Sequence, residues 1–220
     1  KNFDRYDWTR GTAMNRHNTD NAGAKLWADC DWAAGVTSVG GDWAFNHIYS
    51  TNLGQPLAHP EGHYTHAKAR HTGNLWLRHA KRWQRFDAAA SAGVSLTPYG
   101  TSALWSLSAG YAPAAGLRLE AGAWQSMRLP TFTDLYYTSP AQINNLDLVP
   151  EHAVTYRFGI DYLKRCWNLS AQAYYRSGRD IIDWVWREDM GGKWHSEQTS
   201  RLDTFGAEFA GGYAVSEGFL

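Results

Sequence analysis

The sequence predicts an all-β chain whose antiparallel up-and-down strands form part of the wall of a transmembrane β-barrel. Three observations support this prediction: apolar and polar residues alternate along many segments, the connections between segments alternate in length, and aromatic residues gather beside the short connections. About ten strands are expected. The whole chain, residues 1–220, is expected to be one partial barrel domain, an internal piece of a longer protein.

Composition limits the fold class but does not decide it. The 220 residues carry 21 Lys and Arg against 21 Asp and Glu, so no net charge indicates a nucleic-acid partner. The chain is rich in Trp and Tyr, with 12 of each, yet its mean hydropathy is -0.51 and no apolar run is long enough for a transmembrane helix. A membrane strand barrel has this composition, and so does a soluble aromatic-rich β-protein that binds carbohydrate.

Turn-forming residues divide the chain into the predicted strands, and period-2 alternation gives each strand one apolar and one polar face. In the first clear case, Ala24, Leu26, Ala28, Cys30 and Trp32 share a face. The same pattern recurs around residues 86–96 and 117–123, and it is strongest in residues 154–162 and 167–176. The predicted strands are 2–14, 21–34, 37–51, 63–82, 85–98, 101–112, 116–128, 151–163, 166–187 and 193–213.

One predicted strand, 63–82, departs from the pattern because both of its faces carry basic residues. Lys68, Arg70 and Arg78 fall on one face, whereas His71, His79 and Lys81 fall on the other. A β-bulge, or an extension of the strand beyond the lipid, would explain this charge distribution.

The connections between the strands mostly alternate in length. Short ones fall near residues 34–35, 82–84, 112–116 and 163–165, and longer ones at 15–20, 52–62, 129–150 and 188–192, with the tight turn 98–100 on the long-loop side. Outer-membrane barrels have tight turns at one rim and extended loops at the other. A β-sandwich has no reason to sort its loops in this way.

Aromatic residues lie within a few positions of the short turns, where an interfacial girdle is expected. They are Trp32, Trp83, Phe86, Tyr111, Tyr162, Trp167 and Tyr213. Aromatic residues are also simply common in strands, which is the alternative explanation. The two cysteines, Cys30 and Cys166, have no metal-binding or redox spacing, and we interpret both as free.

A motif between two predicted strands resembles a known family. The stretch Arg128-Leu129-Pro130-Thr131-Phe132-Thr133-Asp134-Leu135-Tyr136-Tyr137, followed by Asn145-Leu146-Asp147-Leu148-Val149-Pro150-Glu151, resembles the TonB-dependent receptor pattern R-x-P-(S/T)-F-x-(D/E)-L-Y and N-x-x-L-x-P-E. Residues 179–184 and 204–209 are similar to two further strand motifs of this family, and residues 48–54 to a segment of cobalamin-type members. The resemblance is strongest over about residues 125–213.

The resemblance implies a barrel of about twenty-two strands around an N-terminal plug domain. It also implies outer-membrane localisation and active uptake of a scarce nutrient, cobalamin or a metal-siderophore complex, powered by TonB through the plug. The implied partners are outer-membrane lipid, TonB and the small-molecule nutrient. Neither a plug domain nor the remaining strands are expected within residues 1–220, and no enzyme activity or cofactor is implied.

Exposed aromatic and amide residues on the long loops are the candidate ligand-binding residues, because stacking and hydrogen bonding can hold a large polar molecule at the barrel rim. The candidates are Tyr136, Tyr137, Gln142, Asn144, Asn145, Asn52, Gln55 and His59. A metal site formed by His59, His63 and His66 beside Glu61 is not favoured, because loop histidines of mixed spacing are usually solvated. The acidic pairs Glu188–Asp189 and Asp180–Asp183 do not predict an active site.

Overall fold

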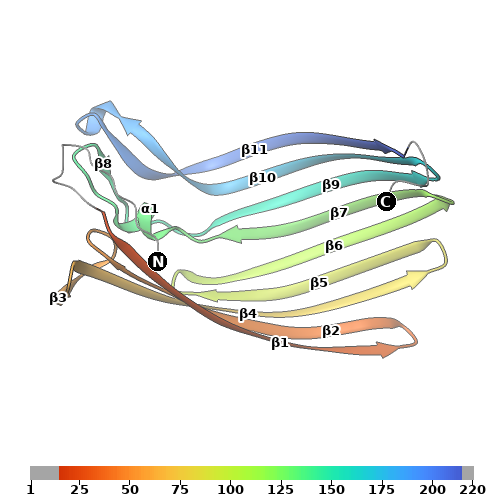
Figure 1. Cartoon of the computed structure of the whole chain (residues 1–220), viewed down its shortest axis with the longest axis horizontal. Coiled ribbons are helices and arrows are strands. Elements are labelled where there is room, and N and C mark those ends of the chain that lie inside the picture. Colours follow the sequence, from red (N-terminus) through yellow and green to blue (C-terminus); the bar gives the residue numbers. More distant parts are fainter. Residues whose placement is uncertain (1–14, 215–220) are drawn as a thin grey trace.

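The computed structural model describes residues 15–214, and these form long strands with few other elements (Figure 1). The predicted strand 2–14 lies outside the described residues. The elements are β1 (His17–Trp32), β2 (Gly35–Ser50), β3 (Gln55–Glu61), β4 (Tyr64–Trp83), β5 (Phe86–Thr97), β6 (Gly100–Ala114), β7 (Leu117–Arg128), α1 (Phe132–Tyr136), β8 (Gln142–Ile143), β9 (Glu151–Lys164), β10 (Trp167–Arg187), the 3₁₀ turn η1 (Glu188–Met190) and β11 (Lys193–Tyr213).

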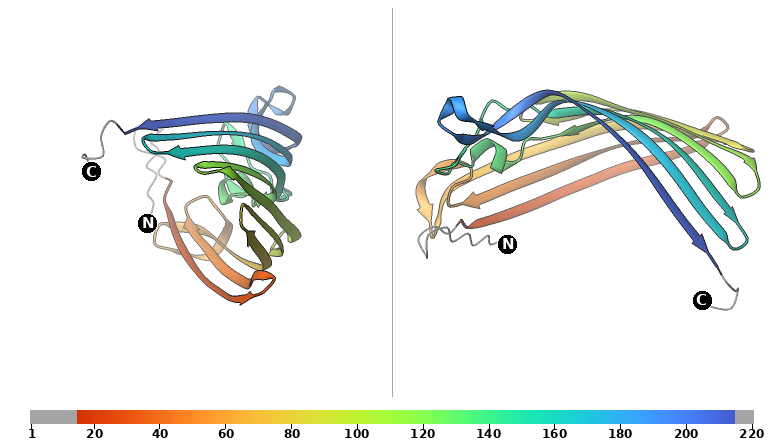
Figure 2. Two further views of the ribbon diagram at one scale, coloured as in Figure 1. Left: turned by 90° about the vertical axis from the view of Figure 1, so that its right-hand side faces the viewer. Right: turned by 90° about the horizontal axis from the view of Figure 1, so that it is seen from above.

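The strands form one sheet in which neighbours in space are, with few exceptions, neighbours in sequence. The order is β1-β2-β4-β5-β6-β7-β9-β10-β11-β8, and every pair is antiparallel except the short β11–β8 pair. Strand β3 lies off this path and pairs with β4. Figure 2 shows that the sheet curves like an open section of a cylinder. The predicted fold class, up-and-down strands of a transmembrane β-barrel, is confirmed, with the sheet left open in this chain.

The connections are sorted by length as predicted. Figure 1 shows the β1–β2, β4–β5, β6–β7 and β9–β10 turns at one end of the sheet, and α1, β3 and β8 at the other, where the β5–β6 turn is the one tight connection, as predicted. The tight hairpins depend on glycine where the chain must turn closely: Gly116, before β7, has φ +80°, and a Cβ there would lie 2.1 Å from the carbonyl oxygen of Leu163. Only glycine adopts this conformation at no steric cost.

Three predicted loops contain unpredicted structure. Residues 15–20 were expected to be a loop, but β1 begins at His17 and includes residues 17–20. Residues 52–62 were expected to be a loop, but Gln55–Glu61 form β3, whose pairing with β4 is irregular between Pro56 and Glu61. The prolines hide this strand from a pattern search because proline cannot donate to a sheet ladder. Residues 129–150 were also expected to be a loop, and they contain α1 and β8.

The unusual charge pattern of β4 reflects an extension rather than a bulge. The strand pairs with β2 in continuous register from His66 to Ala80, whereas its pairing with β5 begins only at Gly73. Residues 64–72 therefore project beyond β5 toward the long loops. Leu75 and Leu77 lie in the middle of the apolar face, and His71, His79 and Lys81 are displaced toward the ends of that face.

The register gives the sheet one apolar and one polar face. Both aromatic rows lie on the apolar face. One consists of the seven predicted residues beside the tight turns, and the second lies six to ten residues along the strands and is formed by Trp43, Phe45, Trp105, Tyr156, Tyr175 and Phe205. Alanine, leucine and valine lie between the rows. An apolar band bounded by two aromatic girdles is the expected exterior of a membrane barrel.

Charged residues form a connected network on the polar face, across β5, β7 and β9. Arg118 donates to both carboxylate oxygens of Asp87 at 2.8 and 3.1 Å and to Glu120 at 2.6 Å. Arg157 extends the network, with its guanidinium 3.7 Å from Glu120. These side chains are about one-third to one-half exposed, so each pair contributes modestly to stability.

No helix within residues 15–214 is long and apolar enough to cross a membrane. Cys30 and Cys166 are both free, as interpreted from the sequence.

The polar face also contains an aromatic ring that packs directly over a glycine. Tyr174 and Gly206 are opposed residues of β10 and β11, and a Cβ at Gly206 would lie 2.2 Å from the Tyr174 ring. We expect Gly206→Val to destabilise the folded barrel by about 1–3 kcal/mol because the ring must leave its position. Urea unfolding of the full-length receptor in vesicles measures this change.

Gly212 is the matched control for this prediction. It lies on the same face of the same strand, and a Cβ there would meet nothing within 4 Å. We expect Gly212→Val to change the unfolding free energy by less than about 0.5 kcal/mol. Equal effects of the two valines would contradict the packing of Tyr174 on Gly206.

Candidate functional site

The 129–150 segment, which links β7 to β9, is the most structured connection at the long-loop end. Its helix α1 begins with a capping box, in which the Thr131 hydroxyl accepts from the Asp134 amide at 3.1 Å and the Asp134 carboxylate accepts from the Thr131 amide at 2.9 Å. These reciprocal bonds satisfy two amide groups that a helix start leaves unpaired. They allow a helix of only five residues to form here.

A buried carboxylate fastens both ends of the 129–150 segment to the sheet. Glu151, at the start of β9, is 5% exposed and accepts a hydrogen bond from Arg128 at the end of β7. Its same oxygen accepts from the Ile182 amide of β10 at 2.8 Å. The Arg128 guanidinium also lies 3.7 Å from Asp134 of α1. One arginine and two carboxylates therefore join β7, α1, β9 and β10.

Two further contacts hold the segment across the polar face. Arg70, on the polar face of β4, donates to the Pro130 carbonyl at 2.7 Å and lies 4.8 Å from the centre of the Phe132 ring. Figure 2 shows the segment within the curve of the sheet. Because Arg70 binds it from the polar face, that face is the concave one, as in a barrel interior.

The far side of the segment is bound by the β10–β11 hairpin. Strand β8 pairs with β11 in parallel at Trp194 and His195. The Gln198 side chain both donates to the Val149 carbonyl at 2.8 Å and accepts from the Val149 amide at 3.2 Å. The segment therefore contacts β4, β7, β9, β10 and β11. It crosses the concave face of the sheet at the long-loop end.

A small apolar core lies under the segment. Leu135 and Leu148 pack with Ile182 of β10, and all three are less than about one-tenth exposed. Tyr99, in the tight turn between β5 and β6, and Tyr136 pack against this core. Burial raises the pKa of the Tyr99 hydroxyl above its usual range, so this hydroxyl is a neutral hydrogen-bonding group at physiological pH.

Four of the eight predicted ligand-binding residues use their amides within the protein. Asn144 donates to the Leu135 carbonyl at 2.6 Å, Gln142 accepts from the Ser139 hydroxyl at 3.4 Å, and Asn145 accepts from the Asp147 amide at 2.9 Å. Asn52, at the end of β2, donates to Asn15 at 3.0 Å. These amides shape the loops.

The other four predicted residues fall into two groups. Tyr136 and Tyr137 end α1, and both are partly buried. Gln55 and His59 are exposed on β3, in a hairpin that extends from the long-loop end. No hydrogen bond within residues 15–214 engages the side chains of Tyr137, Gln55 or His59, so these three can still bind a ligand.

Arg70 and Gln198 hold the 129–150 segment from outside it, and neither contact was predicted from the sequence. Neither is adjacent to the segment in sequence, and each resembles an ordinary polar strand residue. Arg128 and Glu151 were quoted as motif residues, and their pairing across the segment explains their positions at its two ends. Within residues 15–214, no group of three or more His, Cys, Asp or Glu has an arrangement that could hold a metal ion.

Comparison with known proteins places this architecture in a family. Residues 2–219 match the family model described as TonB dependent receptor-like, beta-barrel. A curated relative, the vitamin B12 transporter BtuB of Photobacterium profundum, is 25% identical over 119 residues, which are 53% of this chain and 19% of the relative. The chain thus spans about a fifth of the length of that relative.

Solved structures show the same fold at low sequence identity. The siderophore receptor PirA from Acinetobacter baumannii superposes with a TM-score of 0.70 and 16% identity over 93% of this chain and 36% of that one. The ferric enterobactin receptor PfeA from Pseudomonas aeruginosa gives 0.72 and 12% identity over 92% and 34%. The copper transporter OprC gives 0.66 and 15% identity over 92% and 36%. This family consists of outer-membrane receptors and transporters rather than enzymes, and the chain belongs to the TonB-dependent receptor β-barrel family.

Proposed function

We propose that this chain forms part of the barrel wall and outer loops of an outer-membrane receptor that takes up a scarce nutrient with energy supplied through TonB. The observation that carries the proposal is the two-faced sheet, with an apolar band between two aromatic rows on one face and charged networks on the other. This arrangement suits contact with lipid outside and with a polar lumen inside. The plug domain and the remaining strands would come from the rest of the protein.

Cobalamin and metal-siderophore complexes are the proposed ligand classes. The relative named as a vitamin B12 transporter supports the first, and the folds named as siderophore receptors support the second. Family membership gives no support to the alternative of a soluble aromatic-rich β-protein that binds carbohydrate, and that alternative also required the sorted loop lengths to be accidental.

The proposed ligand contacts are side chains at the long-loop end whose polar groups are not engaged within the described residues. Tyr137 offers a ring for stacking, and Gln55 and His59 offer hydrogen bonds from the β3–β4 hairpin. The amides of Gln142, Asn144, Asn145 and Asn52 would then act mainly by holding the loops through hydrogen bonds to backbone and side-chain groups, and Tyr136 by packing on the core under α1.

Uptake by cells that express the full-length receptor tests the proposed function. Cells lacking their own receptors would be supplied with radiolabelled cyanocobalamin or with ferric enterobactin. We expect accumulation of one of the two, and we expect deletion of tonB to abolish it. The triple variant Gln55→Ala, His59→Ala and Tyr137→Ala should weaken ligand binding at least about tenfold, through loss of about 1.4 kcal/mol or more.

The matched control for the triple variant is Asn18→Ala, His63→Ala and Tyr64→Phe, which changes residues of similar type in β1, in the β3–β4 turn and at the start of β4. We expect it to leave binding within about twofold, a difference of less than about 0.5 kcal/mol. Accumulation of ligand that continues without TonB would overturn the proposed mechanism of uptake.

A further inference from the structure

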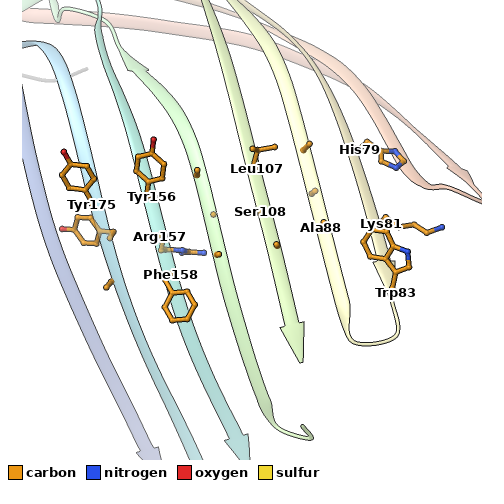
Figure 3. A pocket seen from close by; sticks show the side chains of 18 of the residues that line it. His79, Lys81, Trp83, Ala88, Leu107, Ser108, Tyr156, Arg157, Phe158 and Tyr175 are labelled. Carbon is orange, nitrogen blue, oxygen red and sulfur yellow. The ribbon is translucent and has the colours of Figure 1, made fainter. Parts of the chain in front are cut away.

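Two adjoining hollows lie on the apolar face of the sheet. The larger has a volume of about 1050 Å³ and spans β4 to β11. Figure 3 shows Tyr156, Phe158 and Tyr175 along one side of it, with Lys81 and Trp83 on the other. The hollow exists because small side chains line the strands between these rings and leave the space above them unfilled. They are Ala88, Ala90, Ala109, Ala121, Ala123 and Ala173.

The second hollow is polar and begins where the first one ends. It measures about 580 Å³ and shares Tyr156 and Tyr175 with the larger hollow. Gln125, Ser177, Arg179 and Arg201 supply polar side chains to it, together with His152. The hollow lies beyond the outer aromatic row, on the side of the long loops, because His152 and Ser177 follow Tyr156 and Tyr175 in that direction.

The two arginines of this hollow lie opposite each other, so both could bind one anion placed between them. Arg179 of β10 is directly opposite Arg201 of β11 in the ladder. Side chains in such positions are close neighbours, and like charges there repel. Both remain largely exposed, at 68% and 65% of their side-chain surface.

Neighbouring carboxylates offset this repulsion only in part. Asp180 lies 4.0 Å from Nε of Arg179, and Asp203 lies 3.0 Å from Nε of Arg201. The Nη2 group of Arg201 also donates to the Tyr175 hydroxyl at 3.4 Å. Each guanidinium has five N–H donors, so donors remain on both. Asp203 also accepts from the Tyr175 hydroxyl at 3.0 Å, so this carboxylate borders the hollow, whose own lining residues include two guanidinium groups.

His152 adds a polar atom that has no partner. Its Nε2 lies 3.5 Å from the Ser102 hydroxyl, whereas its buried Nδ1 has no hydrogen-bond partner within residues 15–214. A buried imidazole nitrogen without a partner is unfavourable, so this histidine makes the wall of the hollow polar without saturating its hydrogen bonds.

We propose that the two hollows together bind one phosphate-bearing lipid, with its phosphate between Arg179 and Arg201 and its acyl chains over the alanine-lined hollow. The inference rests on the proposed function, because it requires the apolar face to contact the membrane. The polar hollow lies beyond the outer aromatic row, at the level of lipid headgroups. Paired arginines are well suited to bind phosphate through several charged hydrogen bonds.

Native mass spectrometry of the delipidated full-length receptor tests this proposal, with dioleoylphosphatidic acid as the probe. Dioleoylphosphatidylcholine is the comparison lipid, because it has the same acyl chains and a phosphate whose charge is neutralised by choline. We expect wild-type receptor to bind phosphatidic acid at least about tenfold more tightly than phosphatidylcholine. We expect the double variant Arg179→Ser and Arg201→Ser to lose this preference.

The double variant Lys164→Ser and Arg165→Ser is the matched control, since it removes the same charge from the tight-turn end of the sheet. It should keep the preference for phosphatidic acid. Ala123→Trp fills the apolar hollow and should weaken binding of dioleoylphosphatidic acid severalfold, while binding of the short-chain dihexanoyl form stays unchanged.

Three results would overturn the proposal. One is an equal loss of preference in the control variant, which would indicate a diffuse charge effect. Another is displacement of the lipid by inorganic phosphate at the same concentration as the lipid, which would indicate a site for free phosphate. The third is unchanged lipid binding in the Arg179 and Arg201 variant. Nutrient uptake should remain normal in that variant, so failure of the lipid proposal and failure of the proposed function are distinguishable.

Discussion

Substitution of Leu107 by arginine is expected to lower the free energy of unfolding of the full-length barrel in phospholipid vesicles by about 2–4 kcal/mol. Leu107 lies on the apolar face of β6 between the aromatic residues Trp105 and Tyr111, two residues from the first and four from the second, and it is 55% exposed. Its opposed neighbours are Ala90 and Ala123. An arginine there would lie in the apolar band between the two aromatic rows, where a charge facing lipid is costly.

The neighbouring residue provides the control. Ser108 belongs to the same strand but to the opposite, polar face, where it is opposed by Ala89 and Gly122. We expect Ser108→Arg to change the unfolding free energy by less than about 1 kcal/mol, because a lumen substitution does not bring a charge into lipid. The same substitution at two adjacent residues of one strand is thus expected to cause a large loss of stability at the first and a small loss at the second.

Urea titrations of the refolded receptor, followed by tryptophan fluorescence and by heat-dependent mobility on gels, measure both variants. The comparison tests the register as well as the orientation of the sheet. A larger destabilisation by Ser108→Arg than by Leu107→Arg would mean that the two faces had been assigned the wrong way round.

Alternation along the chain was sufficient to predict most of the wall. Strand β9 shows why: Val154, Tyr156, Phe158 and Ile160 share one face, and the charged Arg157 and Asp161 lie on the other. The period-2 alternation determines which side chains of a strand lie on the apolar face of the sheet. The length of each connection indicates at which end of the sheet it lies. The strand β3 was missed because its pairing is short and irregular and its prolines interrupt the pattern.

The candidate site was less predictable, because its geometry depends on contacts between distant parts of the chain. The sequence Thr131 to Asp134 has the spacing of a capping box, so a local signal for α1 was present. Nothing local shows that the Asn144 amide turns back to the Leu135 carbonyl, or that Arg70, 60 residues before Pro130, donates to its carbonyl. Exposed amides therefore looked like ligand contacts, although they support the loop.

Loss of the Glu151 carboxylate is expected to release the 129–150 segment from the sheet. Glu151→Ala removes the acceptor for both Arg128 and the buried Ile182 amide, and it leaves that amide unsatisfied. We expect a cost of about 2–3 kcal/mol, mostly from the amide, since Arg128 is 46% exposed and its ion pair is partly screened. Hydrogen exchange of residues 129–150 should accelerate about thirtyfold or more at this cost.

Glu208→Ala is the control for the loss of a carboxylate on the same face, because Glu208 is exposed and pairs only with Gln172 of the neighbouring strand among the described residues. It should leave exchange in residues 129–150 unchanged. Equal protection of the segment in Glu151→Ala and in wild-type receptor would show that the remaining contacts, from Arg70, Gln198 and β8, are sufficient to hold it.

Glu151→Gln separates the two functions of the carboxylate. Glutamine can still accept from the Ile182 amide, but it cannot form an ion pair with Arg128. If the amide bond dominates, exchange in the glutamine variant should resemble wild-type much more closely than exchange in Glu151→Ala. If the charge dominates, the two variants should match, and Arg128→Met should restore protection in the Glu151→Gln background by removing the unpaired cation. Since Arg128 also approaches Asp134, the second outcome would make the arginine the centre of the junction between α1 and the sheet.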